Sequence, residues 1–202
     1  MRRLEPARPR GVDPVRRMIY AAARRLYGRT LAPTAVVAHH RPLLVGYSTM
    51  ALFGDRYSRS VEKHLKELAM LRTAQLVECE WCLDFGSWLA SHAGVTEEQL
   101  RELAVWRQSD RFGTVERLVL EYAEAMTRTP ADVSDELFVA LREHFDEREI
   151  VELTMTIGLE NLYSRTNHAM GVEGEGFSEG MYCVRPESSV AADDLEAVPG
   201  AR

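Results

Sequence analysis

Apolar residues recur at every third or fourth position along most of this chain, which is the spacing of a helix that buries one face. No segment alternates apolar and polar residues over the length of a strand. The pattern therefore predicts an all-α protein, a single helical domain with flexible N- and C-terminal tails. The predicted helices cover about residues 14–28, 33–53, 61–77, 82–92, 97–106, 115–129, 135–145 and 147–169.

Capping residues set the boundaries of these helices. Asp13 before Pro14 is typical of a helix start, and Gly28 is typical of a helix end. Pro42 should interrupt the region 33–53, because proline disfavours helix in the residue before it. These signals are local, and we expect the structure to follow them.

The last predicted helix begins after Asp146 and ends at Gly171. Its first half is apolar on nearly all sides, which is typical of a buried element. In its second half Asn161, Arg165 and His168 share one polar face. We therefore expect this helix to be buried at its start and to present polar groups toward its end.

The two ends of the chain differ from the helical region in composition. Residues 1–12 are rich in arginine and proline, which predicts a flexible tail. Residues 172–202 combine many acids with scattered glycines and prolines, which predicts an extended, partly disordered arm. The helical domain should therefore span residues 13–171, with its core motif region at about 45–130.

Composition and charge exclude several classes of function. A chain of 202 residues suits one domain, and a net charge of −6 argues against binding to nucleic-acid phosphates. No run is long and apolar enough to cross a membrane, and the N-terminal residues lack the apolar stretch of a secretory signal. Three cysteines do not make a disulfide framework, so we expect a cytoplasmic protein. Nearly all basic residues are arginine, which suggests a bacterial source with GC-rich DNA.

The candidate chemistry lies at Cys79 and Cys82, a Cys-x-x-Cys motif near the start of a predicted helix. Two thiols at this spacing can close a disulfide, and the free N–H groups of a helix start favour a thiolate. Glu67 lies twelve residues upstream, on a helix that Ser58 or Ser60 can cap. The same spacing occurs in zinc sites, but no second cysteine pair or spaced histidine pair supplies the other ligands. The motif therefore indicates redox chemistry without a metal.

With this motif in place, the chain resembles the carboxymuconolactone decarboxylase and alkyl hydroperoxidase D superfamily. Its hydroperoxidase members carry a glutamate, eleven residues, Cys-x-x-Cys, three residues and a histidine. Glu67, Cys79 and Cys82 match this pattern, and Gly86 stands where the histidine is expected. The resemblance implies an all-α fold, a homo-oligomer and no cofactor. It also implies that Cys82 attacks a peroxide, that Cys79 closes the disulfide, and that Glu67 relays the proton.

The missing histidine leaves this relay incomplete, because histidine is the side chain that titrates nearest neutral pH. His168, Asp84 and His64 are candidates to replace it. We expect either a weak peroxidase or a disulfide as the substrate, since thiol–disulfide exchange tolerates the loss better. A thiol electron donor of unknown identity would restore the dithiol. The alternatives are a cofactor-free lyase like the carboxymuconolactone decarboxylases, and a non-catalytic oligomer with a redox-sensing disulfide.

Overall fold

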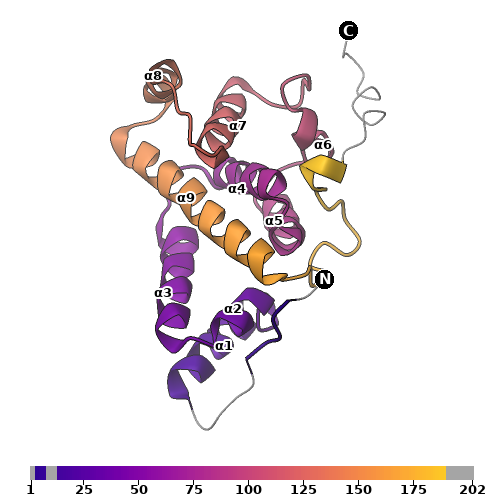
Figure 1. The fold of residues 1–202 in the computed structure, drawn as a ribbon. Helices are drawn as coiled ribbons and strands as arrows, with labels where there is room; N and C mark the ends of the chain where they lie inside the picture. Colours follow the sequence, from indigo (N-terminus) through magenta and orange to yellow (C-terminus); the bar gives the residue numbers. More distant parts are fainter. Residues whose placement is uncertain (1–2, 8–12, 190–202) are drawn as a thin grey trace.

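The computed structural model describes residues 3–7 and 13–189 as helices joined by short loops (Figure 1). No strand occurs in these residues, which confirms the all-α prediction. None of their helices is both long and apolar enough to cross a membrane. Shorter turns of π- or 3-10 helix cover Phe53–Tyr57, Leu103–Val105 and Glu187–Ser189. The α-helices are α1 (Pro14–Tyr27), α2 (Ala32–Val37), α3 (Arg41–Leu52), α4 (Lys63–Val77), α5 (Glu80–His92), α6 (Glu97–Glu102), α7 (Thr114–Thr127), α8 (Asp135–His144) and α9 (Glu147–Met170).

Helix α4 lies at the centre of the fold and packs against α5, α7 and α9 (Figure 1). One apolar cluster includes Leu68 and Leu71 of α4 and extends to α5. A second cluster includes Leu65 and Ala69 of α4 and extends to α7, α8 and α9. Because α4 contributes to both clusters, most of its residues are buried whatever their polarity. A polar side chain on this helix, such as that of Glu67, is therefore enclosed by the protein.

The predicted boundaries are confirmed where a local cap sets them. The Asp13 side chain accepts a backbone N–H at the start of α1, and Gly28 ends that helix with a φ of 76°. Glycine adopts this left-handed conformation without strain. Helix α2 ends at Val37 and α3 begins at Arg41, so the interruption before Pro42 is also confirmed.

The predicted cap of α4 is wrong. This helix begins at Lys63, and neither Ser58 nor Ser60 caps it. The N–H of Ser60 donates instead to the carboxylate of Glu152 on α9, at 2.7 Å. This contact spans 92 positions of sequence, which the capping pattern alone does not reveal.

Helix α9 crosses the molecule beside α4, as the long orange element of Figure 1. The prediction that its first half is buried on nearly all sides is wrong, because Val151 is 62% exposed and Met155 is 57% exposed. Helix α9 packs against α4, α5, α7 and α8 through one face. Its buried positions include a stripe that recurs every three or four residues, formed by Ile150, Leu153, Ile157, Glu160, Ser164 and Asn167. The second half of that buried stripe is polar.

The ends of the described chain lie against the helical domain. The N–H of Ala7 donates to the carbonyl of Ala35 on α2, at 2.9 Å. Residues 172–189 have no α-helix and follow α5, where the N–H of the buried Val184 donates to Ser87 at 3.0 Å. This C-terminal segment, residues 172–189, is therefore part of the packed structure.

Candidate active site

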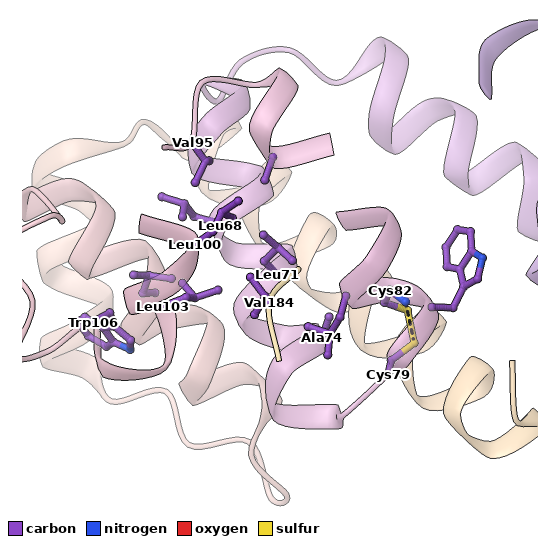
Figure 2. Packing of buried hydrophobic residues seen from close by; sticks show 14 of the residues in the cluster. Leu68, Leu71, Ala74, Cys79, Cys82, Val95, Leu100, Leu103, Trp106 and Val184 are labelled. Atoms are coloured by element: carbon purple, nitrogen blue, oxygen red, sulfur yellow. Dashed lines mark hydrogen bonds between the residues drawn. A yellow bond between two sulfur atoms is a disulfide. The ribbon is translucent and has the colours of Figure 1, made fainter. Parts of the chain in front are cut away.

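Cys79 and Cys82 lie at the start of α5 and are joined by a disulfide, at one edge of the first apolar cluster (Figure 2). Their Cα atoms are 5.3 Å apart. The helix begins earlier than predicted, at Glu80, because the sulfur of Cys79 is its N-cap and accepts the N–H of Cys82 at 3.3 Å. Cys79 is fully buried and Cys82 is 6% exposed. Cys82 is therefore the more accessible member of the pair.

Asn167 connects the dithiol to α9. Its side chain is fully buried, and its amide donates to the sulfur of Cys82 at 3.5 Å. The same side chain hydrogen-bonds to the hydroxyl of Tyr47 on α3. The carbonyl oxygen of Asn167 is buried and has no hydrogen-bond partner in the described part of the chain. Buried side-chain amides normally have partners for both groups, so this oxygen is an unusual feature of the site.

Glu67 and Glu160 bring two carboxylates into the same interior region. Glu67 is 3% exposed on α4, and Glu160 is 6% exposed on α9. The pKa of Glu160 is raised to about 8, mainly by burial; the hydrogen bond from Ser164 lowers it, and the charge of Glu67 makes a smaller contribution that raises it. A carboxyl with this pKa keeps its proton at neutral pH. Glu160 is therefore a neutral carboxylic acid in the interior of the protein.

Two tyrosines lie near Glu160, whose charge acts on both of them. The rings of Tyr47 and Tyr163 meet edge-to-face, with centroids 4.7 Å apart. Burial raises the pKa of Tyr163 to about 12, and Glu160 adds to that effect. Burial raises the pKa of Tyr47 as well, with contributions from Tyr163 and Glu160. Both phenols therefore stay neutral, and Tyr47 reaches the sulfur of Cys82 through the side chain of Asn167.

Asp84, one of the predicted relay residues, anchors the C-terminal segment. Its carboxylate accepts the N–H groups of Glu175, Phe177 and Ser178, at 2.8, 3.1 and 2.8 Å, and the hydroxyl of Ser178 at 2.7 Å. Burial opposes ionisation of Asp84, but these hydrogen bonds outweigh it and lower the pKa. All of these contacts hold residues 175–178, so they support a structural role.

The two predicted relay histidines make their contacts with other partners. His64 lies between the carboxylates of Glu62 and Glu116, at 3.4 and 3.9 Å. The Nδ1 atom of His168 is 3.0 Å from the carbonyl oxygen of Glu78. These contacts give neither histidine a link to the carboxylate pair, and their relay role stays a prediction.

Gly86 lies on α5, one turn after Cys82, where the family pattern has a histidine. A Cβ atom added at this position would lie 3.1 Å from the Cδ2 atom of Leu71 on α4. That distance is shorter than an ordinary van der Waals contact. Any side chain at position 86 therefore requires the side chain of Leu71 to shift by a few tenths of an ångström.

Sequence reasoning missed Glu160, Ser164 and Asn167, although the sequence carries a signal for them. They continue the helical spacing that begins with Leu153 and Ile157, so they fall on the face that the apolar residues bury. Polar residues on a buried stripe are rare and often functional. The prediction followed the neighbouring face of Asn161 instead, which hydrogen-bonds to Thr127.

An open cavity of about 570 Å³ lies on that neighbouring face. It is not lined by either sulfur or by the carboxylate pair, so the dithiol site lies outside it. Its lining residues are Leu76, Val77, Thr127, Arg128, Arg165 and His168. In the described part of the chain, no three histidine, cysteine or acidic side chains come close enough together to hold a metal ion.

Comparison with known proteins identifies the family. Residues 44–125 match the carboxymuconolactone decarboxylase family. The protein YnjA of Escherichia coli (strain K12) is 36% identical over 153 residues, which cover 76% of this chain and 84% of YnjA. This chain belongs to the carboxymuconolactone decarboxylase family. The superfamily indicated by the Cys-x-x-Cys pattern is thereby confirmed.

Solved structures of similar fold include a debrominase and an uncharacterized peroxidase-related protein. A peroxidase-related protein from Silicibacter sp. TM1040 superimposes with a TM-score of 0.79 at 16% identity, over 89% of this chain and 95% of its own. The debrominase Bmp8 superimposes with a TM-score of 0.74 at 20% identity, over 85% of this chain and 91% of its own. A cysteine-to-alanine variant of Bmp8 has been solved in complex with 2,3,4-tribromopyrrole. These similarities show that the family fold is shared.

Proposed function

We propose that this protein is a dithiol oxidoreductase that reduces an organic hydroperoxide or a disulfide through Cys79 and Cys82, with Glu67 as the proton relay. The observation that carries the proposal is the bond between the two sulfurs at the start of α5, beside the buried amide of Asn167. A helix start and an amide donor both favour an ionised sulfur. The site is therefore suited to a thiolate nucleophile.

The reaction with a hydroperoxide would proceed in two steps. The thiolate of Cys82 attacks the terminal peroxide oxygen, the O–O bond breaks, and the departing alkoxide takes a proton to become an alcohol. The thiolate of Cys79 then attacks the sulfenic acid on Cys82, the S–O bond breaks, and the departing hydroxide takes a proton to become water. Two thiols and one peroxide thus yield a disulfide, an alcohol and water. The greater exposure of Cys82 supports its role as the attacking sulfur.

The residue at position 86 supports a disulfide as the better substrate. Without the family histidine, protonation of the alkoxide loses a relay of a kind that contributes roughly 10²–10⁴-fold. Thiol–disulfide exchange expels a thiolate, which is a much weaker base and needs less help. We therefore expect a small disulfide to oxidise the reduced protein faster than an organic hydroperoxide of similar size does.

Thiol counting after rapid mixing tests the proposal. The reduced protein is mixed in a stopped-flow instrument with cumene hydroperoxide, or with hydroxyethyl disulfide, and free thiols are titrated after the reaction. We expect two thiols to be lost in the wild-type protein and in Cys183→Ser, the matched control outside the motif. The variants Cys79→Ser and Cys82→Ser should form no intramolecular disulfide. A wild-type protein that keeps all its thiols with both oxidants would refute the proposal.

Two further arms of this experiment separate the competing functions. Lyase turnover of a muconolactone that persists in both motif variants would favour a carboxymuconolactone-decarboxylase-like activity. A dithiol can also deliver two electrons to a carbon–halogen bond, so a brominated pyrrole is added as a third oxidant because the debrominase Bmp8 shares this fold. Loss of two thiols with that compound alone would move the substrate class from peroxides and disulfides to halogenated rings.

A further inference from the structure

The C-terminal segment is fastened to the helix that carries the dithiol, and Glu175 of this segment is held from two sides. Its N–H donates to the carboxylate of Asp84 on α5 at 2.8 Å. Its carbonyl oxygen accepts from the guanidinium of Arg29, which lies before α2, at 2.7 Å. The same guanidinium lies over the ring of Phe177, 4.6 Å from the ring centroid. The backbone of Glu175 is therefore fixed between α5 and the loop before α2.

The side chain of Glu175 extends this contact to the Cys-x-x-Cys motif itself. Its Oε2 atom accepts the indole N–H of Trp81 at 2.8 Å and the backbone N–H of Ala32 at 2.9 Å. Trp81 is 7% exposed and lies between the two cysteines in sequence. Ala32 is the first residue of α2, a helix whose N-cap residue supplies no side-chain hydrogen bond. One carboxylate oxygen thus joins the motif to the C-terminal segment and to α2.

Aromatic packing fixes the rest of the Trp81 side chain. Its ring stacks on that of Phe85, one turn further along α5, with centroids 4.8 Å apart. The ring of Phe85 meets Phe177 of the C-terminal segment edge-to-face, with centroids 4.9 Å apart. An indole held by a stacked ring and by a hydrogen bond at its N–H has little freedom to turn. The residue between the two cysteines is therefore fixed by contacts outside the motif.

The two cysteines and Trp81 belong to the same turn of the chain. The Cα atoms of Cys79 and Cys82 are 5.3 Å apart, within the roughly 4.4–6.8 Å that a disulfide requires. After reduction no covalent bond holds this turn, so its shape depends on noncovalent contacts such as those of Trp81. Contacts that preserve the shape keep the two thiols ready to close, which favours the disulfide over the dithiol.

We propose that Glu175 is a positioning residue of the dithiol, which stabilises the disulfide by holding Trp81, and that the C-terminal segment is bound more tightly in the oxidised protein than in the reduced one. This inference rests on the function proposed above and adds a regulation of the same site. The two effects are linked, because a contact that favours the disulfide is itself favoured by the disulfide to the same degree. Reduction should therefore loosen the C-terminal segment.

Substitutions at the two ends of the hydrogen bond isolate its effect. Glu175→Met keeps the length of the side chain and removes the acceptor, whereas Glu175→Gln keeps an oxygen that can accept both N–H groups. Trp81→Phe removes the indole N–H and keeps an aromatic ring against Phe85. Glu179→Met is the matched control, because it makes the same change at an exposed glutamate of the same segment. All variants also carry Cys183→Ser, so that only the thiols of the motif respond.

Equilibration with dithiothreitol measures the stability of the disulfide. Dithiothreitol gives up two electrons and two protons and closes its own disulfide, while the protein disulfide becomes a dithiol; alkylation and mass spectrometry give the fraction of each form. We expect Glu175→Met and Trp81→Phe each to favour the dithiol by about 10-fold, which is roughly 30 mV for a two-electron couple. The double variant should go little further, because both changes remove the same bond. Glu175→Gln and Glu179→Met should stay close to the parent Cys183→Ser protein.

Hydrogen exchange measures the second effect. In the parent Cys183→Ser protein, the amides of residues 172–189 should exchange faster in the dithiol form than in the disulfide form, by up to about 10-fold. In Glu175→Met the two forms should exchange at the same rate. Equal exchange in both forms of the parent protein, an unchanged disulfide equilibrium in Glu175→Met, or a double variant whose effect is the full sum of the two single effects would each overturn the inference.

Neither measurement requires turnover, so failure of this inference and failure of the proposed function can be told apart. If equilibrium and exchange respond as expected, but neither cumene hydroperoxide nor hydroxyethyl disulfide consumes thiols after rapid mixing, the proposed function fails and the linkage stands. If the wild-type protein loses two thiols on mixing, while the variants leave equilibrium and exchange unchanged, the proposed function stands and the linkage fails.

Discussion

The anchor at Asp84 makes the most specific prediction for stability. The substitution Asp84→Asn keeps one oxygen, which can still accept the N–H and hydroxyl of Ser178. The new NH₂ group then faces the N–H groups of Glu175 and Phe177, which donate to the other oxygen in the native protein. Two donors lose their acceptor, and each such loss costs roughly 1–3 kcal/mol. Because these N–H groups are only partly buried, we expect a loss of about 2–4 kcal/mol in total.

This loss should appear first in the C-terminal segment. A change of about 3 kcal/mol alters an opening equilibrium by more than roughly 100-fold, so the amides of residues 175–178 should exchange with solvent faster by that factor. If the segment opens only with the whole protein, the melting temperature should fall by roughly 2–4 °C for each kcal/mol. Hydrogen exchange read by mass spectrometry distinguishes these two cases.

Two controls and a pH series complete this test. Ser178→Ala removes one hydroxyl bond and should cost only about 1 kcal/mol, while Asp110→Asn makes the same chemical change at a 91% exposed side chain. In the folded protein the pKa of Asp84 lies below its ordinary value. The contribution of Asp84 to stability is therefore complete at a pH above the ordinary pKa, and it is lost as the pH falls through the lowered pKa. Asp84→Asn should abolish this part of the acid sensitivity. If exchange at residues 175–178 stays at the wild-type rate in a folded Asp84→Asn protein, the anchor argument is wrong.

Two further predictions concern the helices around the site. Gly86→His should not speed oxidation of the dithiol, and it should lower the free energy of unfolding by about 1–3 kcal/mol, because its Cβ meets Leu71. Adding Leu71→Ala should make room for the histidine and raise the stopped-flow rate. Equal rates in the single and the double variant would contradict this packing argument. Lys66→Met should destabilise the protein by about 3–5 kcal/mol in urea unfolding, because it leaves the buried carboxylate of Glu152 without its ammonium partner. The double variant Lys66→Met/Glu152→Leu should recover most of that loss, and a double variant as unstable as the single one would show that the ion pair is not the cause.

The sequence was sufficient for features that depend on neighbours along the chain. The caps at Asp13 and Gly28 and the interruption before Pro42 involve hydrogen bonds or steric contacts within a few residues, and all three are found in the structure. The Cys-x-x-Cys motif and its spacing to Glu67 are local in the same sense. The predicted cap at Ser60 is absent because α4 begins only at Lys63, and the N–H of Ser60 donates to Glu152, 92 positions away.

The remaining features depend on which faces of the helices meet. The exposure of Met155 and the burial of Glu160 follow from the side on which α9 packs, and the apolar content of the helix does not specify that side. Asp84 looked like a relay candidate because it is two residues from Cys82 in sequence. On a helix those two side chains point in different directions, and Asp84 faces the C-terminal segment instead.

The sulfur of Cys79 is both a reactive atom and the N-cap acceptor of α5. An ionised sulfur accepts a hydrogen bond more strongly than a neutral thiol, so in the reduced protein the ordered first turn of α5 and the ionisation of this sulfur reinforce each other. The effect is reciprocal, so a change that loosens this turn should also make the resolving thiol of Cys79 harder to ionise. Gentle warming or a low concentration of denaturant should therefore slow closure of the disulfide well before circular dichroism detects a loss of helix.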